Sequence, residues 1–174
     1  MNRFVTVTTI ALGAGMLAAC ADPVAADPVE AAEAERSPVD QARYLVTASA
    51  FDHDATLRRL LEALDRRDLT VFATVDHQAG AASVDLTLNP ATVVIFGSPQ
   101  IGTALMQADP VMAAELPLRA AVFEDTGGVT HLAVTSPASI GRSFPKVAEA
   151  QAARLDGMAR NLQALSAEVT GTEG

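Results

Sequence analysis

Apolar residues recur along this chain with two different periods. In residues 57–64 and again in residues 155–169, large apolar side chains stand three and four positions apart, which puts them on one face of a helix. Asp52 stands where it can cap the first segment, and Gly171 follows the second, as glycine often does at a helix end. We therefore predict an amphipathic helix after Asp52 and a long final helix over residues 145–169.

The second period is that of β-strands, whose side chains point alternately to the two faces of a sheet. Segments with strand-like composition are residues 44–50, 69–75, 93–96, 118–124 and 129–135, with residues 84–88 weakly extended. An Asp-Thr-Gly-Gly turn at residues 125–128 joins the last two strands as a hairpin. The order of elements predicts an α+β fold: an antiparallel sheet with two long helices on one face, in β-α-β(4)-α order.

The strand at residues 93–96 runs directly into the turn that is the best candidate for a site. Ser98 can cap a short helix, and Pro99 suits its first position because the missing N–H would lack a partner there. Backbone donors at such a helix start are left free and favour negative charge. We therefore predict ligand-binding residues at this turn, on its helix and after an earlier strand: Gly97, Ser98, Gln100, Thr103, Gln107 and His77.

Polar residues near these elements also allow catalytic interpretations, but their spacing favours structural ones. Ser98 lacks the downstream glycine of a nucleophile elbow, so we interpret it as an N-cap. His77 beside Asp76 could act in acid–base chemistry, yet neighbours on a strand point to opposite faces, which favours a surface or capping role. Glu124 and Asp125 could divide acid and base roles, but next to a glycine turn they are more typical turn formers. We therefore predict no catalytic residue.

Histidine and cysteine patterns give no support for a metal site or a cofactor. Asp52, His53 and Asp54 are adjacent in sequence, and three neighbouring residues rarely converge on one ion. His131 stands alone in the middle of a predicted strand, and the chain has a single cysteine, Cys20. We therefore predict neither a metal nor a cofactor.

The charge balance argues against nucleic-acid binding, because phosphate contact needs clustered basic residues. The formal net charge is -9, the sequence pI is about 4.6, and the chain has no tryptophan on which a base could stack. Two arginine pairs, at residues 58–59 and 66–67, stand among acidic residues and are interpreted as a solvated helix face.

The N-terminus has the pattern of an export signal. A basic start is followed by an apolar run over residues 4–17, which is short for a membrane span and typical of a signal peptide. The run ends in Leu17-Ala18-Ala19-Cys20, which resembles the bacterial lipoprotein lipobox. The resemblance implies cleavage before Cys20 and lipid attachment to its thiol, whereas the alternative is an ordinary secretory signal that happens to include a cysteine.

These observations predict three segments: a lipoprotein signal peptide at 1–19, a lipidated cysteine with an acidic disordered linker at 20–42, and a single α+β domain at 43–170. Ala21 follows the cysteine, rather than the aspartate that favours retention in the inner membrane. We expect a protein of the cell envelope, lipid-anchored and facing the periplasm, with the outer membrane favoured.

Several motifs in the predicted domain resemble those of the domain of unknown function 302 family. They are TVFATVDH at 70–77, a short segment at 79–82, VIFGSP at 94–99, GTALMQADP at 102–110 and LPLRAAVFED at 116–125. The resemblance spans about residues 44–166. It implies a β-α-β(4)-α fold like half of a TATA-binding-protein saddle, frequent homodimers, and no established activity, cofactor or substrate.

Two departures from the family pattern bear on function. Ser98 stands where the family commonly has asparagine, and Val134-Thr135-Ser136-Pro137 replaces a Tyr-Asn-Asp-Pro-like sequence. If those groups bind a ligand in relatives, this chain binds a different ligand or none. The preferred hypothesis is a non-catalytic module that binds a small ligand or a protein partner. The alternatives are a structural or self-associating domain and an uncharacterised enzyme using Ser98, His77 or Glu124.

Overall fold

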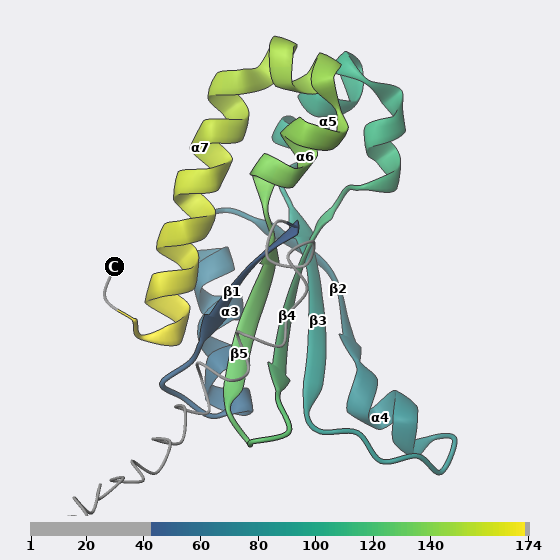
Figure 1. Cartoon of the computed structure of the whole chain (residues 1–174), viewed down its shortest axis with the longest axis vertical. Helices are drawn as coiled ribbons and strands as arrows, with labels where there is room; N and C mark the ends of the chain where they lie inside the picture. Colours follow the sequence, from purple (N-terminus) through teal and green to yellow (C-terminus); the bar gives the residue numbers. More distant parts are fainter. Residues whose placement is uncertain (1–42, 173–174) are drawn as a thin grey trace, which may run out of the picture.

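The computed structural model describes residues 43–172, and the predicted signal peptide, Cys20 and the whole acidic linker lie outside them. Five strands form one antiparallel sheet, as predicted, and they lie in the order β1-β5-β4-β3-β2 (Figure 1). The strands are β1 Tyr44–Ala48, β2 Thr70–Asp76, β3 Ala91–Gly97, β4 Leu118–Glu124 and β5 Thr130–Thr135. None of the helices in residues 43–172 has the length and apolar composition needed to cross a bilayer.

The two long helices, α3 (His53–Asp65) and α7 (Pro145–Thr170), lie on the same face of the sheet (Figure 1). Asp52 caps α3 as predicted, because its carboxylate accepts a 2.7 Å hydrogen bond from the amide of Ala55. Gly171 ends α7 in the left-handed conformation, at a φ of 73° that favours glycine. The backbone of α7 departs from helical geometry at Gln151, which the sequence pattern did not predict.

The core lies between this pair of helices and the covered face of the sheet. Alternate residues of the three central strands point into it, and they are almost fully buried: Val94, Phe96, Leu118, Ala120, Val122, Leu132 and Val134. Both helices supply their predicted apolar stripes, including Leu60, Leu64, Leu155, Leu162 and Leu165. The periods read from the sequence therefore identify the core correctly.

The β2 end of the sheet departs from the prediction. The alternation expected along β2 is interrupted at Phe72, where the register with β3 shifts in a bulge, and every residue of β2 is exposed. The short helix α4 (His77–Ala82) follows β2, and residues 84–88, predicted to be weakly extended, form a turn and loop with no strand. β2 is an edge strand, so fewer neighbours hold its alternation in place.

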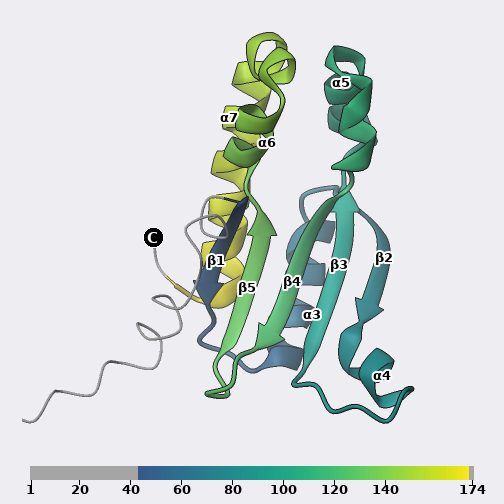
Figure 2. The same cartoon turned by 45° about the vertical axis from the view of Figure 1, so that its right-hand side comes forward.

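Three further helical segments, α5 (Pro99–Ala108), the 3₁₀ helix η1 (Pro110–Ala114) and α6 (Pro137–Ser143), extend beyond one end of the sheet. Only the first was predicted as a helix. In Figure 2, α5 stands on one side of this end and α6, with the first turns of α7, stands on the other.

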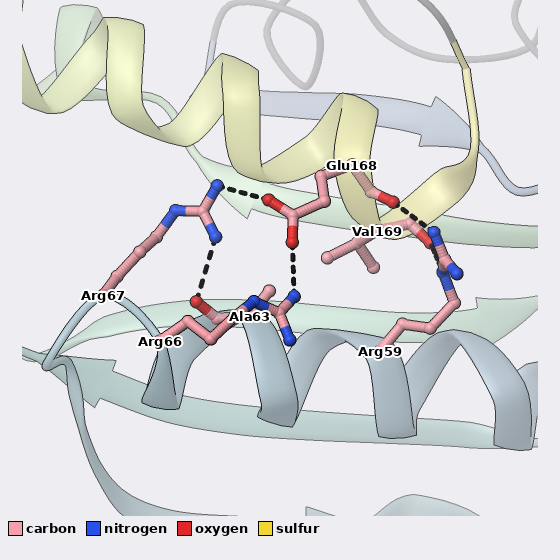
Figure 3. Close-up of polar contacts among 6 residues, drawn as sticks. All are labelled: Arg59, Ala63, Arg66, Arg67, Glu168 and Val169. Carbon is pink, nitrogen blue, oxygen red and sulfur yellow. Dashed lines mark hydrogen bonds and ion pairs between the residues drawn. The ribbon is translucent and has the colours of Figure 1, made fainter.

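The two arginine pairs lie on α3 and directly after its end, and the prediction of a solvated face is wrong for Arg59 and Arg67, which are only partly exposed. Arg59 donates hydrogen bonds to the carbonyl oxygens of Val169 (2.9 Å) and Glu168 (2.6 Å) at the end of α7 (Figure 3). Arg66 and Arg67 both bind the carboxylate of Glu168. These contacts join the two long helices, and a sequence pattern cannot reveal partners about a hundred residues apart.

His131 is not alone either, because the β4–β5 turn brings Asp125 to it. Its Nε2 lies 2.8 Å from Asp125 Oδ2, while Asp125 Oδ1 accepts from the amides of Gly127 (2.8 Å) and Val129 (3.0 Å). The His131 hydrogen bond and these amides hold the pKa of Asp125 below its usual range. Asp125 is thus a turn former, as predicted, and it also anchors a buried histidine.

Candidate functional site

The turn that follows β3 is built as the sequence predicts. Ser98 is the N-cap of α5 and its Oγ accepts a long, 3.5 Å hydrogen bond from the amide of Ile101. Its carbonyl oxygen accepts the first helical bond, from the amide of Gly102 at 2.9 Å. Ser98 is therefore committed to starting the helix, which fits the N-cap interpretation better than a nucleophile.

A groove of about 740 Å³ opens beside this turn, at the end of the sheet between α5 and α7. Phe96 and Leu118, which face each other across β3 and β4, form its floor. Its walls are Ile101 and Met106 from α5, Met158 and Leu162 from α7, and Leu69, Phe72, Ala113, Leu116 and Pro117 from nearby segments. The volume falls within the range of sites that hold small molecules, about 300–1,000 Å³, and the lining is largely apolar as in such sites.

Polar groups of the groove come from three places. Ser98, Gln100 and Thr103 lie on the first turns of α5, and Asn161 lies on α7. Arg67 and Asp68 lie in the link between α3 and β2. Gln100, Thr103, Asn161 and Asp68 are exposed, so these four belong to the outer part of the groove. The site combines an apolar interior with a polar rim.

Arg67 is the only cationic residue among the described residues that line this groove. Its Nη1 donates to the carbonyl oxygen of Ala63 at 3.0 Å and its Nη2 to Glu168 Oε2 at 2.5 Å (Figure 3). Hydrogen bonds from Arg67 and then from Arg66 hold the pKa of Glu168 below its usual range. The guanidinium groups of Arg66 and Arg67 therefore share one ionised carboxylate, and these three side chains together carry a net positive charge.

The predicted ligand-binding residues divide into two sets. Gly97, Ser98, Gln100 and Thr103 line the groove, whereas Gln107 and His77 do not. Thr70, the first residue of β2, pairs with Gly97 beside the Ser98 turn, whereas His77 follows the other end of β2. At a rise of roughly 3.3 Å per residue, His77 therefore lies about 20 Å from that turn along the strands. Asp76 instead caps α4, accepting from the amide of Ala79 at 2.9 Å.

The same separation bears on the catalytic hypothesis. Ser98 directly follows the last residue of β3, Gly97. Glu124 is the last residue of β4 and lies at the opposite end of the sheet, because its neighbour Phe123 pairs with the first residue of β3, Ala91. Ser98 therefore meets neither His77 nor Glu124. Both of these side chains lie at the far end of the sheet from the groove.

Most of the apolar lining is not apparent from the sequence. Met158 and Leu162 belong to the predicted stripe of α7, and that stripe gives no sign of where the helix passes the end of the sheet. Met106 is only partly buried and lines the groove. Phe72, half exposed at 51%, reaches the groove through the β2 bulge. A bulge of this kind has no clear signature in a single sequence.

Comparisons with known proteins agree with the fold. The model of the family described as "Domain of unknown function DUF302" matches residues 45–162. The chain belongs to the DUF302 family. A crystal structure of an uncharacterized conserved DUF302 protein from Bacillus stearothermophilus matches with a TM-score of 0.63 at 16% identity. It covers 72% of this chain and 97% of that one. At this identity the likeness shows the shared DUF302 fold alone.

Curated relatives of this DUF302 chain include larger proteins. "Fluoride-specific ion channel FluC 1" of Brucella suis biovar 1 (strain 1330) is 41% identical over 83 residues, which are 48% of this chain and 33% of that protein. "Fluoride-specific ion channel FluC 2" of Brucella melitensis biotype 1 (strain ATCC 23456 / CCUG 17765 / NCTC 10094 / 16M) is 41% identical over 83 residues, 31% of its length. The chain therefore spans about a third of the length of these relatives.

Proposed function

We propose that this DUF302 chain is a membrane-anchored, non-catalytic module that holds a small, largely apolar molecule in the groove between α5 and α7. The observation that carries the proposal is the groove itself, about 740 Å³ with an apolar lining and a polar rim. Ion conduction, named for the Brucella relatives, is not part of the proposal, because the shared segment is about a third of their length.

A ligand in the groove would be stabilised because it would cover apolar side chains that are now partly exposed to water. Phe72 is 51% exposed, and Ile101, Met106 and Leu116 are only partly buried. Covering apolar surface contributes about 25 cal/mol per Å² removed from water. Methionine side chains on both walls are unbranched and adjust to irregular shapes, which suits a ligand of variable form.

The anchor is proposed from the sequence. Leu17-Ala18-Ala19-Cys20 supports lipid attachment at Cys20, and the acidic segment after it would hold the domain away from the lipid surface. Several acyl chains bind a membrane far more firmly than one. The groove would then face the periplasm, where it could take up a ligand near the envelope.

A specific observation also favours a second role, self-association through β2. Of the seven exposed large hydrophobic residues in the described part of the chain, six lie between Val71 and Leu88. β2 has a ladder partner on one side only and carries no lysine or proline, the residues that usually protect an edge. An antiparallel pair of β2 strands centred on Ala73 would set Val71 against Val75 of the second copy and keep the two Asp76 residues apart.

The groove is tested with an uncharged fluorescent probe, N-phenyl-1-naphthylamine, whose emission rises in apolar sites. Thr103→Trp places a bulky ring at the groove, and Gln107→Trp, on the same helix and also exposed, is the matched control because Gln107 does not line it. We expect the wild type and Gln107→Trp to bind the probe and Thr103→Trp to lose about tenfold in affinity. Equal binding by both variants would remove the groove from the proposed function.

A further inference from the structure

We propose that the ligand of this groove is a single-chain amphiphile with an anionic head, a medium- to long-chain carboxylate. Its chain would lie between Met106 and Met158 and its head would bind Arg67. The inference rests on the proposed function, since it names the chemical class that the same groove would hold.

The shape and chemistry of the interior favour an aliphatic chain. The walls contribute mainly branched aliphatic and thioether groups. Phe96 is 1% exposed in the floor and offers little open ring face, so Phe72, 51% exposed at the β2 side, is the one open aromatic ring among the described lining residues. Flat ring systems are favoured by stacking on aromatic side chains, and this arrangement gives little of that. A flexible chain gains contact with an irregular aliphatic surface without needing a fixed outline.

The charge of the head follows from the state of Arg67. Arg66 and Arg67 together carry two positive charges, and the ionised Glu168 between them carries one negative charge. The contacts of Arg67 with Ala63 and Glu168 use two of its five N–H groups. The side chain of Arg67 is 28% exposed, so its field on a bound ligand is screened less than that of a fully solvated charge.

Asp68 is a negatively charged residue on the same rim, and its repulsion of an anionic ligand head must be compared with the attraction of Arg67. Asp68 is exposed, so water and salt screen it more strongly than the partly buried Arg67. The balance therefore favours an anion at Arg67, and a carboxylate can accept two parallel hydrogen bonds from a guanidinium group. Removing Asp68 should strengthen this preference.

The test compares dodecanoate with dodecanol by native mass spectrometry of the full chain in its Cys20→Ser form, which prevents acylation at Cys20. We expect dodecanoate to bind about tenfold more tightly than dodecanol, the effect of one charge-assisted hydrogen bond. Arg67→Gln should remove this difference between the two compounds, whereas Asp68→Asn should raise dodecanoate affinity severalfold. Arg58→Gln, an exposed arginine of α3 outside the groove, should change neither.

The outcomes separate the two proposals. Equal affinity for both compounds, unaffected by Arg67→Gln, would overturn the anionic head and leave the groove as a binding site. Binding of N-phenyl-1-naphthylamine with neither chain bound would overturn the ligand class alone. Chain binding that survives Thr103→Trp would place the chain elsewhere and overturn the inference. Failure of the probe and both chains would overturn the inference and the proposed function together. Dodecanol binding also checks that Arg67→Gln is folded.

Discussion

At the scale of single residues, arginine side chains connect parts of the molecule that lie far apart in the sequence. Arg59 binds the last carbonyl groups of α7 and stacks over the ring of Phe51, with 4.2 Å between the guanidinium carbon and the ring centroid. A cation at a helix C-terminus is favoured by the helix dipole. Glu168 accepts from Arg66 and Arg67, so one carboxylate joins the end of α3 to the end of α7.

This cluster predicts a pH-dependent contribution to stability. The pKa of Glu168 is lowered in the folded state, so its contribution is fully present above the unfolded-state pKa and is lost as pH falls through the folded-state pKa. Glu168→Gln should lower the free energy of unfolding at pH 7 by on the order of 1 kcal/mol, since the pair is partly solvated and screened. Urea unfolding at pH 7 and pH 3 measures the difference, which should shrink at the lower pH.

Glu149→Gln is the matched control for this measurement, because Glu149 is an exposed residue on the same helix. It should leave the unfolding midpoint unchanged at both pH values. A Glu168→Gln penalty that stays constant from pH 7 to pH 3 would show that the ionised carboxylate is not the source of the stabilisation.

At the scale of elements, local patterns predict the interior far better than the edges. β4 runs from Leu118 to Glu124, as the sequence predicts, and α7 begins at Pro145 as predicted and ends one residue later than predicted, at Thr170. Each of these elements buries one face, and the regular spacing of apolar residues in the sequence shows which face that is. The β2 bulge, the kink at Gln151 and the helix α6 have no comparable periodic signature in the sequence. For the same reason, the turn of the candidate site was predictable while its wall on α7 was not.

The leucine stripe of α3 gives a graded prediction for core packing. Leu60 is fully buried and Leu61 only partly, although both belong to the stripe. Leu60→Ala should cost about 2–5 kcal/mol, as large-to-small changes do in packed cores, and Leu61→Ala should cost less. The urea midpoints of the two variants provide the comparison. A larger loss for Leu61→Ala would mean that α3 is rotated relative to the sheet.

At the scale of the whole molecule, one sheet serves two surfaces. Its helix-covered face ends in the groove, and six of the seven exposed large apolar residues in the described part of the chain lie on β2 or in the segment after it, up to Leu88. The two surfaces adjoin at Phe72, a β2 residue that also lines the groove. Ligand uptake and self-association would therefore involve neighbouring parts of the molecule.

Self-association through β2 predicts a dimer at micromolar concentration. Val75→Lys should shift the protein to monomer, because a lysine on an edge strand opposes pairing with another strand. Val111→Lys is the control, since Val111 is also an exposed valine, 63% against 41% for Val75, but lies outside the β2 edge. Sedimentation velocity distinguishes the states. A monomeric wild type at every accessible concentration would contradict the proposal.

The proposed anchor is tested by the location of the whole protein. Wild type should enter the detergent-rich phase of a Triton X-114 separation, because attached acyl chains dominate partitioning. Cys20→Ser should block acylation and leave the protein in the aqueous phase or in uncleaved form. Equal partitioning of the two forms would rule out lipid attachment at Cys20.

The central claim is that an apolar molecule binds between α5 and α7, and methionine methyl signals report on it directly. Two of the five methionines, Met106 and Met158, line the groove from opposite walls, while Met112 is fully buried in the core. In NMR spectra of the methyl-labelled chain, titration with N-phenyl-1-naphthylamine should shift the Met106 and Met158 signals and leave the Met112 signal in place. Saturating probe with no movement of either groove methionine would contradict the account.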